Sequence, residues 1–122
     1  MRERSDLTGL VVEDEWLLRL ELVEELTRAG WRTLEAATGE EALALLNRGE
    51  HFDFLVTDIR LPGTVDGWQV AENVRKLHPL IPVIYVSANP INDARRVPES
   101  VFLGKPCDVG LLLRTCDQLV RA

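Results

Sequence analysis

Three consecutive carboxylates stand directly after a short apolar run near the start of the chain. Residues 9–12 lead straight into Glu13, Asp14 and Glu15. Neighbouring carboxylates repel one another, and a bound divalent cation relieves that repulsion because it takes oxygen ligands. The alternative is an acidic helix N-terminus, where carboxylates interact favourably with the helix dipole. That alternative accounts well for Glu15 and poorly for Glu13 and Asp14, which precede the expected helix.

Three further polar residues follow later apolar runs. Asp58 comes directly after residues 52–57, and the turn sequence behind it presents it on a loop. Ser87 ends the next run, and Lys105, one of two lysines, follows residues 101–103. A lone Asp or Ser is ordinarily a helix cap and a lone lysine a surface residue, so each signal is modest by itself. A lysine at such an end could also bind a carboxylate or a phosphate as a compact positive charge.

The apolar runs ahead of these residues have the length and composition of strands buried on both faces. They are rich in Val, Ile and Leu without clean alternation, and they predict strands at residues 7–12, 33–37, 52–57, 83–87 and 101–103. Helical patterns separate them, so the chain is predicted to be an α/β protein, a flavodoxin-like doubly wound five-stranded parallel sheet with helices on both faces. Ligands of such sheets bind beyond the carboxyl ends of the strands, where the polar residues above stand.

The helical segments carry their own start and stop signals. The first ends before Gly30, the second opens with a capping box of Thr38 and Glu41, and the last begins near Asp108. The third is predicted to turn one face, with apolar residues at positions 70, 74 and 77, toward the core. Two prolines between residues 87 and 101 leave room only for a short or irregular fourth helix.

Composition limits the class of protein. The chain has 122 residues and a net charge of −6, which predicts one domain over residues 1–122, without an output domain, and argues against direct nucleic-acid binding. No apolar run reaches the roughly 20 residues of a membrane span, and no secretory signal follows the charged start. The two cysteines are too few for a disulfide framework, so reduced thiols and a cytoplasmic location are expected.

In their order and their positions at strand ends, these residues resemble the receiver domain of bacterial two-component response regulators, the CheY-like family. The resemblance covers essentially the whole chain and rests on residues 11–15, 57–63, 66–67 and 105–106. It implies that Asp58 accepts a phosphoryl group from the phosphohistidine of a histidine kinase or a histidine phosphotransfer protein, with Mg²⁺ as cofactor. The domain would then change its contacts with a downstream protein target.

The resemblance also implies roles for the neighbouring residues. Asp14 and Asp58 would bind Mg²⁺ directly and Glu13 mostly through water. The backbone carbonyl of Arg60 would supply a further ligand. Lys105 would contact Asp58 before transfer and the phosphoryl oxygens after it.

Two residues are implied in a conformational switch. Ser87 would donate its hydroxyl to a phosphoryl oxygen, and Phe102, three residues before Lys105, would rotate inward. Core packing alone would also explain an apolar residue at Phe102, and the two roles are compatible. Such a switch is a shift of population between two packings of one fold.

The sequence departs from the family pattern at several points. The loop at residues 63–67 is one residue longer than the commonest form, and the stretch from Ser87 to Lys105 is shorter than usual. Cys107 replaces a common apolar aromatic and is interpreted as a tolerated small apolar residue. Arg60 and Asn89, two residues beyond Asp58 and Ser87, are expected to affect how water reaches the phosphoryl group.

Two other functions stay open. A Mg²⁺-dependent phosphatase also uses a nucleophilic Asp, but it needs a second acid two residues on, where this chain has Arg60. A degenerate receiver would bind partners without phosphorylation, which the complete set of site residues disfavours. We expect no enzymatic activity beyond assistance to the domain's own phosphorylation and dephosphorylation. The oligomeric state, and whether the chain stands alone or comes from a hybrid kinase, stay open.

Overall fold

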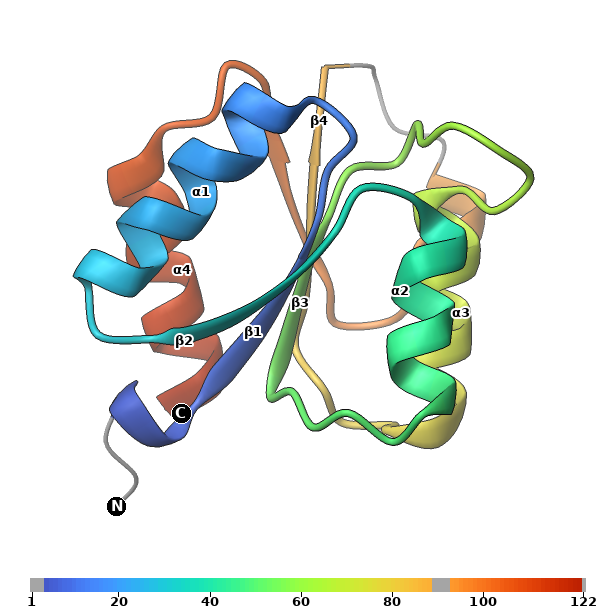
Figure 1. Ribbon diagram of the computed structural model, residues 1–122, viewed down its shortest axis with the longest axis horizontal. Helices are drawn as coiled ribbons and strands as arrows, with labels where there is room; N and C mark the ends of the chain where they lie inside the picture. Colours follow the sequence, from blue (N-terminus) through green and yellow to red (C-terminus); the bar gives the residue numbers. More distant parts are fainter. Residues whose placement is uncertain (1–3, 89–92, 122) are drawn as a thin grey trace.

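The computed structural model describes residues 4–88 and 93–121 and confirms the predicted fold class. A five-stranded parallel sheet runs through the middle of the molecule in the order β2-β1-β3-β4-β5 (Figure 1). This is the order of a flavodoxin-like doubly wound sheet. The strands are β1 (Thr8–Val12), β2 (Arg32–Ala36), β3 (Phe54–Thr57), β4 (Val83–Ser87) and β5 (Val101–Gly104).

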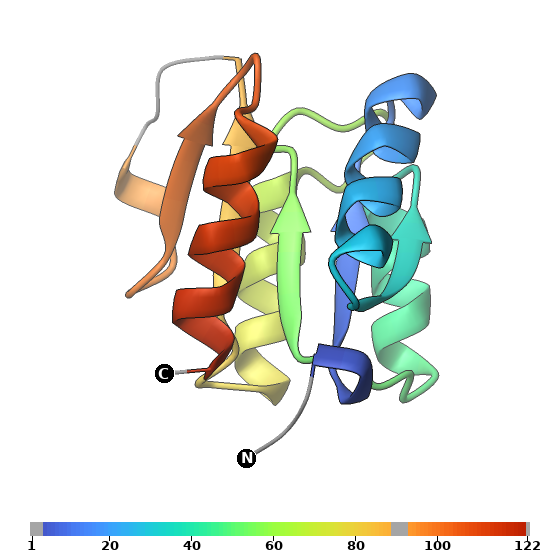
Figure 2. The ribbon, with the colours of Figure 1, turned by 90° about the vertical axis from the view of Figure 1, so that its left-hand side faces the viewer.

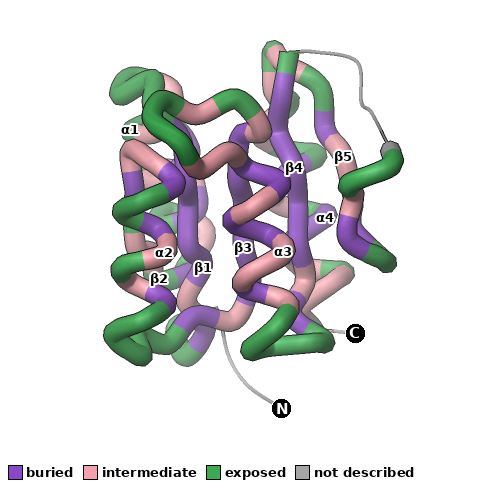
Figure 3. Tube along the Cα trace, turned by 90° about the vertical axis from the view of Figure 1, so that its right-hand side faces the viewer, coloured by how far each residue is buried: buried purple, intermediate pink, exposed green. Residues whose placement is uncertain are grey.

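Helices cover both faces of the sheet. On one face α1 (Trp16–Arg28) lies beside α4 (Val109–Arg121), as Figure 2 shows. On the other face α2 (Gly39–Asn47) lies beside α3 (Gly67–Leu77), as Figure 3 shows. The described residues between β4 and β5 hold a single 3₁₀ turn, Asp93–Arg95, which agrees with the predicted short or irregular helix. A further 3₁₀ turn, Arg4–Asp6, precedes β1.

The central strands are buried on both faces, which explains why their sequences do not alternate. Every residue of β3 and β4 is buried, and the tube of Figure 3 is purple along both strands. Alternate side chains of these strands enter two core clusters, one under α2 and α3 and the other under α1 and α4. The edge strand β2 buries only Ala36.

The helix N-termini follow local sequence signals, with one correction to the expected pattern. Thr38 accepts the N–H of Glu41 at 3.0 Å, as predicted, but the Glu41 carboxylate accepts from the N–H of Ala37 and not from that of Thr38. The complete capping box lies instead at α3, where Asp66 and Gln69 each accept a backbone N–H from the other. The Asp-x-x-Gln spacing was the available signal for it.

The apolar face of α3 is shorter than predicted. Val70 and Val74 are fully buried, whereas Leu77 is 59% exposed, so the expectation that it faces the core is wrong. Leu77 lies on the same face as Val70 by helical spacing, but it is the last residue of α3, and the helical conformation ends at His78.

Both cysteines are free thiols beside or within the last helix, as the sequence indicated. Cys116 is fully buried in α4, and burial raises the pKa of its thiol to about 12. Cys107 precedes that helix and is partly exposed, with a pKa raised by burial and by the charge of Asp108.

We therefore expect the two thiols to differ in reactivity. A maleimide at pH 8 should modify Cys107 first and Cys116 about 100-fold more slowly or less, since only the accessible thiolate reacts. Mass spectrometry of the native protein should show one modification, and two after denaturation. Cys107→Ser is the control, and rapid native labelling of that variant would contradict the assignment.

Candidate functional site

The carboxyl ends of four strands meet at one edge of the sheet, and backbone hydrogen bonds continue the sheet pattern into the residues beyond them. The N–H of Glu13 donates to Ala36 at 3.0 Å, and that of Asp58 donates to Val12 at 2.9 Å. The N–H of Lys105 donates to the carbonyl of Ser87 at 3.1 Å. The sheet itself therefore fixes the backbone of these site residues, which is why strand-end positions predicted their convergence.

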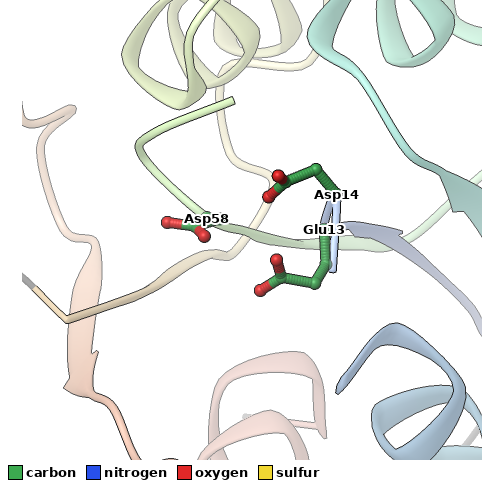
Figure 4. A group of neighbouring side chains, drawn as sticks. All are labelled: Glu13, Asp14 and Asp58. Carbon is green, nitrogen blue, oxygen red and sulfur yellow. The ribbon is translucent and has the colours of Figure 1, made fainter. Parts of the chain in front are cut away.

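The structure brings together the three acids that the sequence singled out. Glu13, Asp14 and Asp58 each offer one carboxylate oxygen, and these atoms all lie within 4.8 Å of one another (Figure 4). Glu13 and Asp14 come from the end of β1 and Asp58 from the end of β3. Glu13 and Asp58 are buried and Asp14 is exposed. Hard oxygen donors in this number suit Mg²⁺, which needs only one or two carboxylates besides water.

Lys105 neutralises part of this cluster. Its Nζ lies 2.8 Å from Glu13 Oε1 and 2.8 Å from Asp58 Oδ2. Burial raises the pKa of Glu13, and the hydrogen bond from Lys105 opposes that rise. Burial alone would lower the pKa of Lys105, but its hydrogen bonds to Asp58 and Glu13 together raise it above the ordinary value. Lys105 therefore stays charged and bridges the two buried acids.

The second oxygen of Asp58 is held by the loop that follows β3. Asp58 Oδ1 accepts the N–H of Ile59 at 2.6 Å and that of Arg60 at 3.3 Å. One oxygen thus faces a lysine and the other faces two backbone amides. This arrangement fixes the plane of the Asp58 carboxylate.

Two features around Glu13 were not found from the sequence. Arg19 of α1 donates from Nη1 to the backbone carbonyl of Glu13 at 2.8 Å, and its Nε pairs with Glu35 of β2 at 3.2 Å. The Glu13 carboxylate also accepts the N–H of Glu15 at 3.1 Å. No spacing rule links Arg19 to Glu35, because the contact forms only when the helix lies over the sheet.

Close packing of the backbone explains why a glycine follows Asp66. A Cβ at Gly67 would lie 1.9 Å from the backbone oxygen of Asp58, so no larger residue fits. The N–H of Gly67 donates to the carbonyl of Ile59 at 2.7 Å, which closes the base of the loop. Asp66 caps α3 at the same point.

The two residues of the expected switch lie on neighbouring strands, β4 and β5. Ser87 is buried at the end of β4. Phe102 of β5 is partly buried, pairs in register with Tyr85 and packs against the cluster under α2 and α3. Core packing of Phe102 is therefore observed, and its rotation stays a prediction.

The sequence also singled out Arg60, Asn89 and Cys107. The metal-ligand role of the Arg60 carbonyl stays a prediction, as does the influence of Arg60 on water. Asn89 lies outside the described residues. Cys107 follows Lys105 and Pro106, which are joined by a cis peptide bond, and it packs against the cluster under α1 and α4.

Comparison with known families and structures identifies the family of this chain. Residues 10–116 match the response regulator receiver domain family. A crystal structure of a response regulator receiver protein from Sinorhizobium medicae WSM419 superposes with a TM-score of 0.91 at 35% identity, covering 95% of both chains. The receiver domain of the hybrid histidine kinase CckA gives 0.80 at 31% identity, covering 93% of this chain and 98% of that one.

Curated relatives are longer proteins. The chain is 33% identical over 129 residues to the sensor kinase CckA of Brucella abortus, covering 98% of this chain and 14% of that protein. It is 40% identical over 79 residues to the transcriptional regulatory protein AfsQ1 of Streptomyces coelicolor, covering 65% of this chain and 34% of that protein. The chain belongs to the response regulator receiver domain family of two-component systems. Among its described residues, no helix combines the length and apolar character needed to cross a membrane.

Proposed function

We propose that this receiver domain accepts a phosphoryl group on Asp58 from a phosphohistidine, with Mg²⁺ as cofactor. The donor would be a histidine kinase or a histidine phosphotransfer protein. One observation carries the proposal: Glu13, Asp14 and Asp58 converge within 4.8 Å while Lys105 contacts two of them at 2.8 Å. Similarity to receiver segments of a sensor kinase and a transcriptional regulator supports the same class of donor.

The chemistry is transfer of a phosphoryl group from nitrogen to a carboxylate oxygen. A carboxylate oxygen of Asp58 attacks phosphorus, the P–N bond breaks, and its electron pair stays on the imidazole of the donor. Glu13, Asp14 and Asp58 would hold Mg²⁺, which when bound offsets the charge of the phosphoryl oxygens. The backbone carbonyl of Arg60 would add a ligand.

The residues of the chain itself position the reactants. The amides of Ile59 and Arg60 orient Asp58, and Lys105 places a positive charge beside the oxygen that it contacts. After transfer, Lys105 and the hydroxyl of Ser87 would donate to phosphoryl oxygens. Catalysis of this kind is mainly positioning and charge compensation.

The new hydrogen bond to Ser87 would favour one packing of β4 and β5 over another. Phe102 lies opposite Tyr85 across these two strands, so a displacement of β4 changes the space open to its ring. We propose that this population shift alters the contacts of the domain with a downstream protein target.

Two other functions would give different results in a phosphorylation experiment. A degenerate receiver would have the same fold and bind its partner without phosphorylation. An aspartyl-phosphate phosphatase would turn over many equivalents of substrate, but position 60, where such an enzyme needs an acid, is Arg. We therefore propose that the domain assists only its own phosphorylation and dephosphorylation.

The direct experiment follows the intact mass of the protein with Mg²⁺ and acetyl phosphate. Wild type should gain one phosphoryl adduct that is labile at high pH, and Asp58→Asn should gain none. Asp108→Asn is a matched control, because Asp108 caps α4 through the N–H of Leu111 and asparagine caps equally well. Absence of a wild-type adduct, even with the cognate kinase, would leave the degenerate receiver. Multiple turnover without an adduct would favour the phosphatase.

A further inference from the structure

The loop between β3 and α3, residues 59–66, is tied directly to Asp58 at its base. Its first two amides donate to Asp58 Oδ1, and its base is closed by the hydrogen bond from Gly67 to Ile59. A shift in the loop backbone therefore moves the donors that orient the carboxylate. This is also the loop that carries the extra residue noted in the sequence.

The far end of the loop is held by Glu40 in the first turn of α2. Glu40 Oε2 accepts the backbone N–H of Thr64 at 3.0 Å and its hydroxyl at 3.3 Å. Backbone hydrogen bonds, first of all that from Thr64, lower the pKa of Glu40, so the carboxylate is charged at neutral pH. A charged acceptor gives stronger hydrogen bonds than a neutral one.

Two glycines allow this close approach. Gly63 has a φ of +87°, and a Cβ there would lie 2.4 Å from Glu40 Oε2. A Cβ at Gly39, the first residue of α2, would lie 2.4 Å from the backbone oxygen of Val65. The backbone at Gly39 thus packs against the loop backbone at Val65, and the loop backbone at Gly63 packs against the Glu40 carboxylate.

We propose that Glu40 is a positioning residue for the phosphoryl-transfer site, acting through Thr64 to hold the lengthened loop against α2. The proposal rests on the function proposed above. A longer loop has more conformations to lose when it is ordered, so an anchor at its far end limits those conformations. When the loop is held, the amides of Ile59 and Arg60 keep their positions around Asp58. The carboxylate would then already be oriented before Mg²⁺ binds.

Glu41 provides a matched control for Glu40. Both are exposed acids in the first turn of α2, and both accept backbone N–H groups. Glu41 accepts from Ala37, outside the loop, so its replacement removes the same charge and a cap contact without touching Thr64. Any difference between variants at the two positions therefore reports on the loop.

The test measures the Mg²⁺ dissociation constant by isothermal titration calorimetry and the rate of adduct formation with acetyl phosphate. Glu40→Ala should raise the dissociation constant about fivefold and slow adduct formation by a similar factor, whereas Glu41→Ala stays within about twofold of wild type. Equal dissociation constants for the two variants would overturn the proposal. Wild type that binds no Mg²⁺ would overturn it together with the proposed function, so the two failures are distinguishable.

A conservative variant separates positioning from simple loss of stability. Glu40→Gln keeps an oxygen for the Thr64 N–H but loses the charge, so its dissociation constant should lie between those of wild type and Glu40→Ala. If Glu40→Ala unfolds below the assay temperature, the test uses Glu40→Gln instead. A Mg²⁺ dissociation constant of Glu40→Gln equal to that of wild type overturns the proposal. Amide exchange at Thr64 should quicken in the order wild type, Glu40→Gln, Glu40→Ala.

Discussion

Replacing Lys105 with methionine is expected to reduce adduct formation with acetyl phosphate by about 100-fold, the scale for loss of one preorganised donor to a developing charge. Lys105 supplies the Nζ that contacts both Asp58 and Glu13. Methionine keeps a long apolar stem but has no donor. Lys76→Met is the matched control, because Lys76, the other lysine, is exposed on α3. A loss no larger in Lys105→Met than in this control would contradict the role of Lys105.

Lys105→Met is also expected to lower the stability of the metal-free protein. Glu13 and Asp58 would face each other without a cation, which should lower the free energy of unfolding by about 2 kcal/mol at pH 7. This is less than for a fully buried pair, because the Lys105 side chain is 18% exposed. The measurement is urea denaturation of both lysine variants and wild type.

The pH dependence of this loss has a definite sign. Burial already raises the pKa of Glu13 above its unfolded value, and removal of Lys105 takes away the hydrogen bond that opposes the rise. An acid with a raised folded pKa stabilises the fold below its unfolded pKa, and that stability is lost as the pH rises through the folded pKa. The destabilisation of Lys105→Met should therefore grow from pH 5 to pH 7. A loss that shrinks over this interval would show that repulsion between the acids is not its cause.

The methyl group added by Gly67→Ala is expected to lower the free energy of unfolding by about 3 kcal/mol. Its Cβ would lie 1.9 Å from the backbone oxygen of Asp58 and 2.7 Å from the Cα of Ile59. Both are backbone atoms, so the strain cannot be relieved by a change of rotamer. Displacement of Asp58 should also suppress the phosphoryl adduct.

Gly110→Ala is the control with the opposite expected sign. Gly110 is exposed in α4, and a Cβ there would meet only the ends of the Asp108 and Arg114 side chains, at 3.3 and 3.4 Å. Alanine should raise the free energy of unfolding by about 0.5–1 kcal/mol, since it is the better helix former. Urea denaturation measures both variants, and equal effects would show that the close approach at Gly67 is relieved at little cost.

The described part of the shortened connection between β4 and β5, residues 93–100, is tied to α3 by side-chain contacts. Arg95 pairs with Glu72 at 2.9 Å and with Asp66 at 3.3 Å, and Arg75 donates to the carbonyl of Pro98. The hydroxyl of Tyr85 in β4 accepts the N–H of Val97. These contacts replace part of the packing that a longer helix would provide.

Local sequence was sufficient to predict the sheet and the position of the site. The apolar runs predicted the strands because parallel strands are buried on both faces, and four of the polar residues at their ends, Asp58, Ser87, Lys105 and Glu13, had to meet at one edge. The corrections also have local explanations. The prediction for Leu77 was wrong at the last residue of α3, where the helix ends.

Contacts between distant segments were decided by the tertiary structure alone. Arg19 meets Glu35, and Glu40 meets Thr64, only after the helices have packed on the sheet and the loop has closed. No periodicity or motif encodes such pairs, since each depends on the position of two elements in space. The amino-acid sequence thus determined which residues carry the proposed chemistry, because strand ends are set locally. The packing of helices on the sheet decided how those residues are held, because that requires every element to be in place.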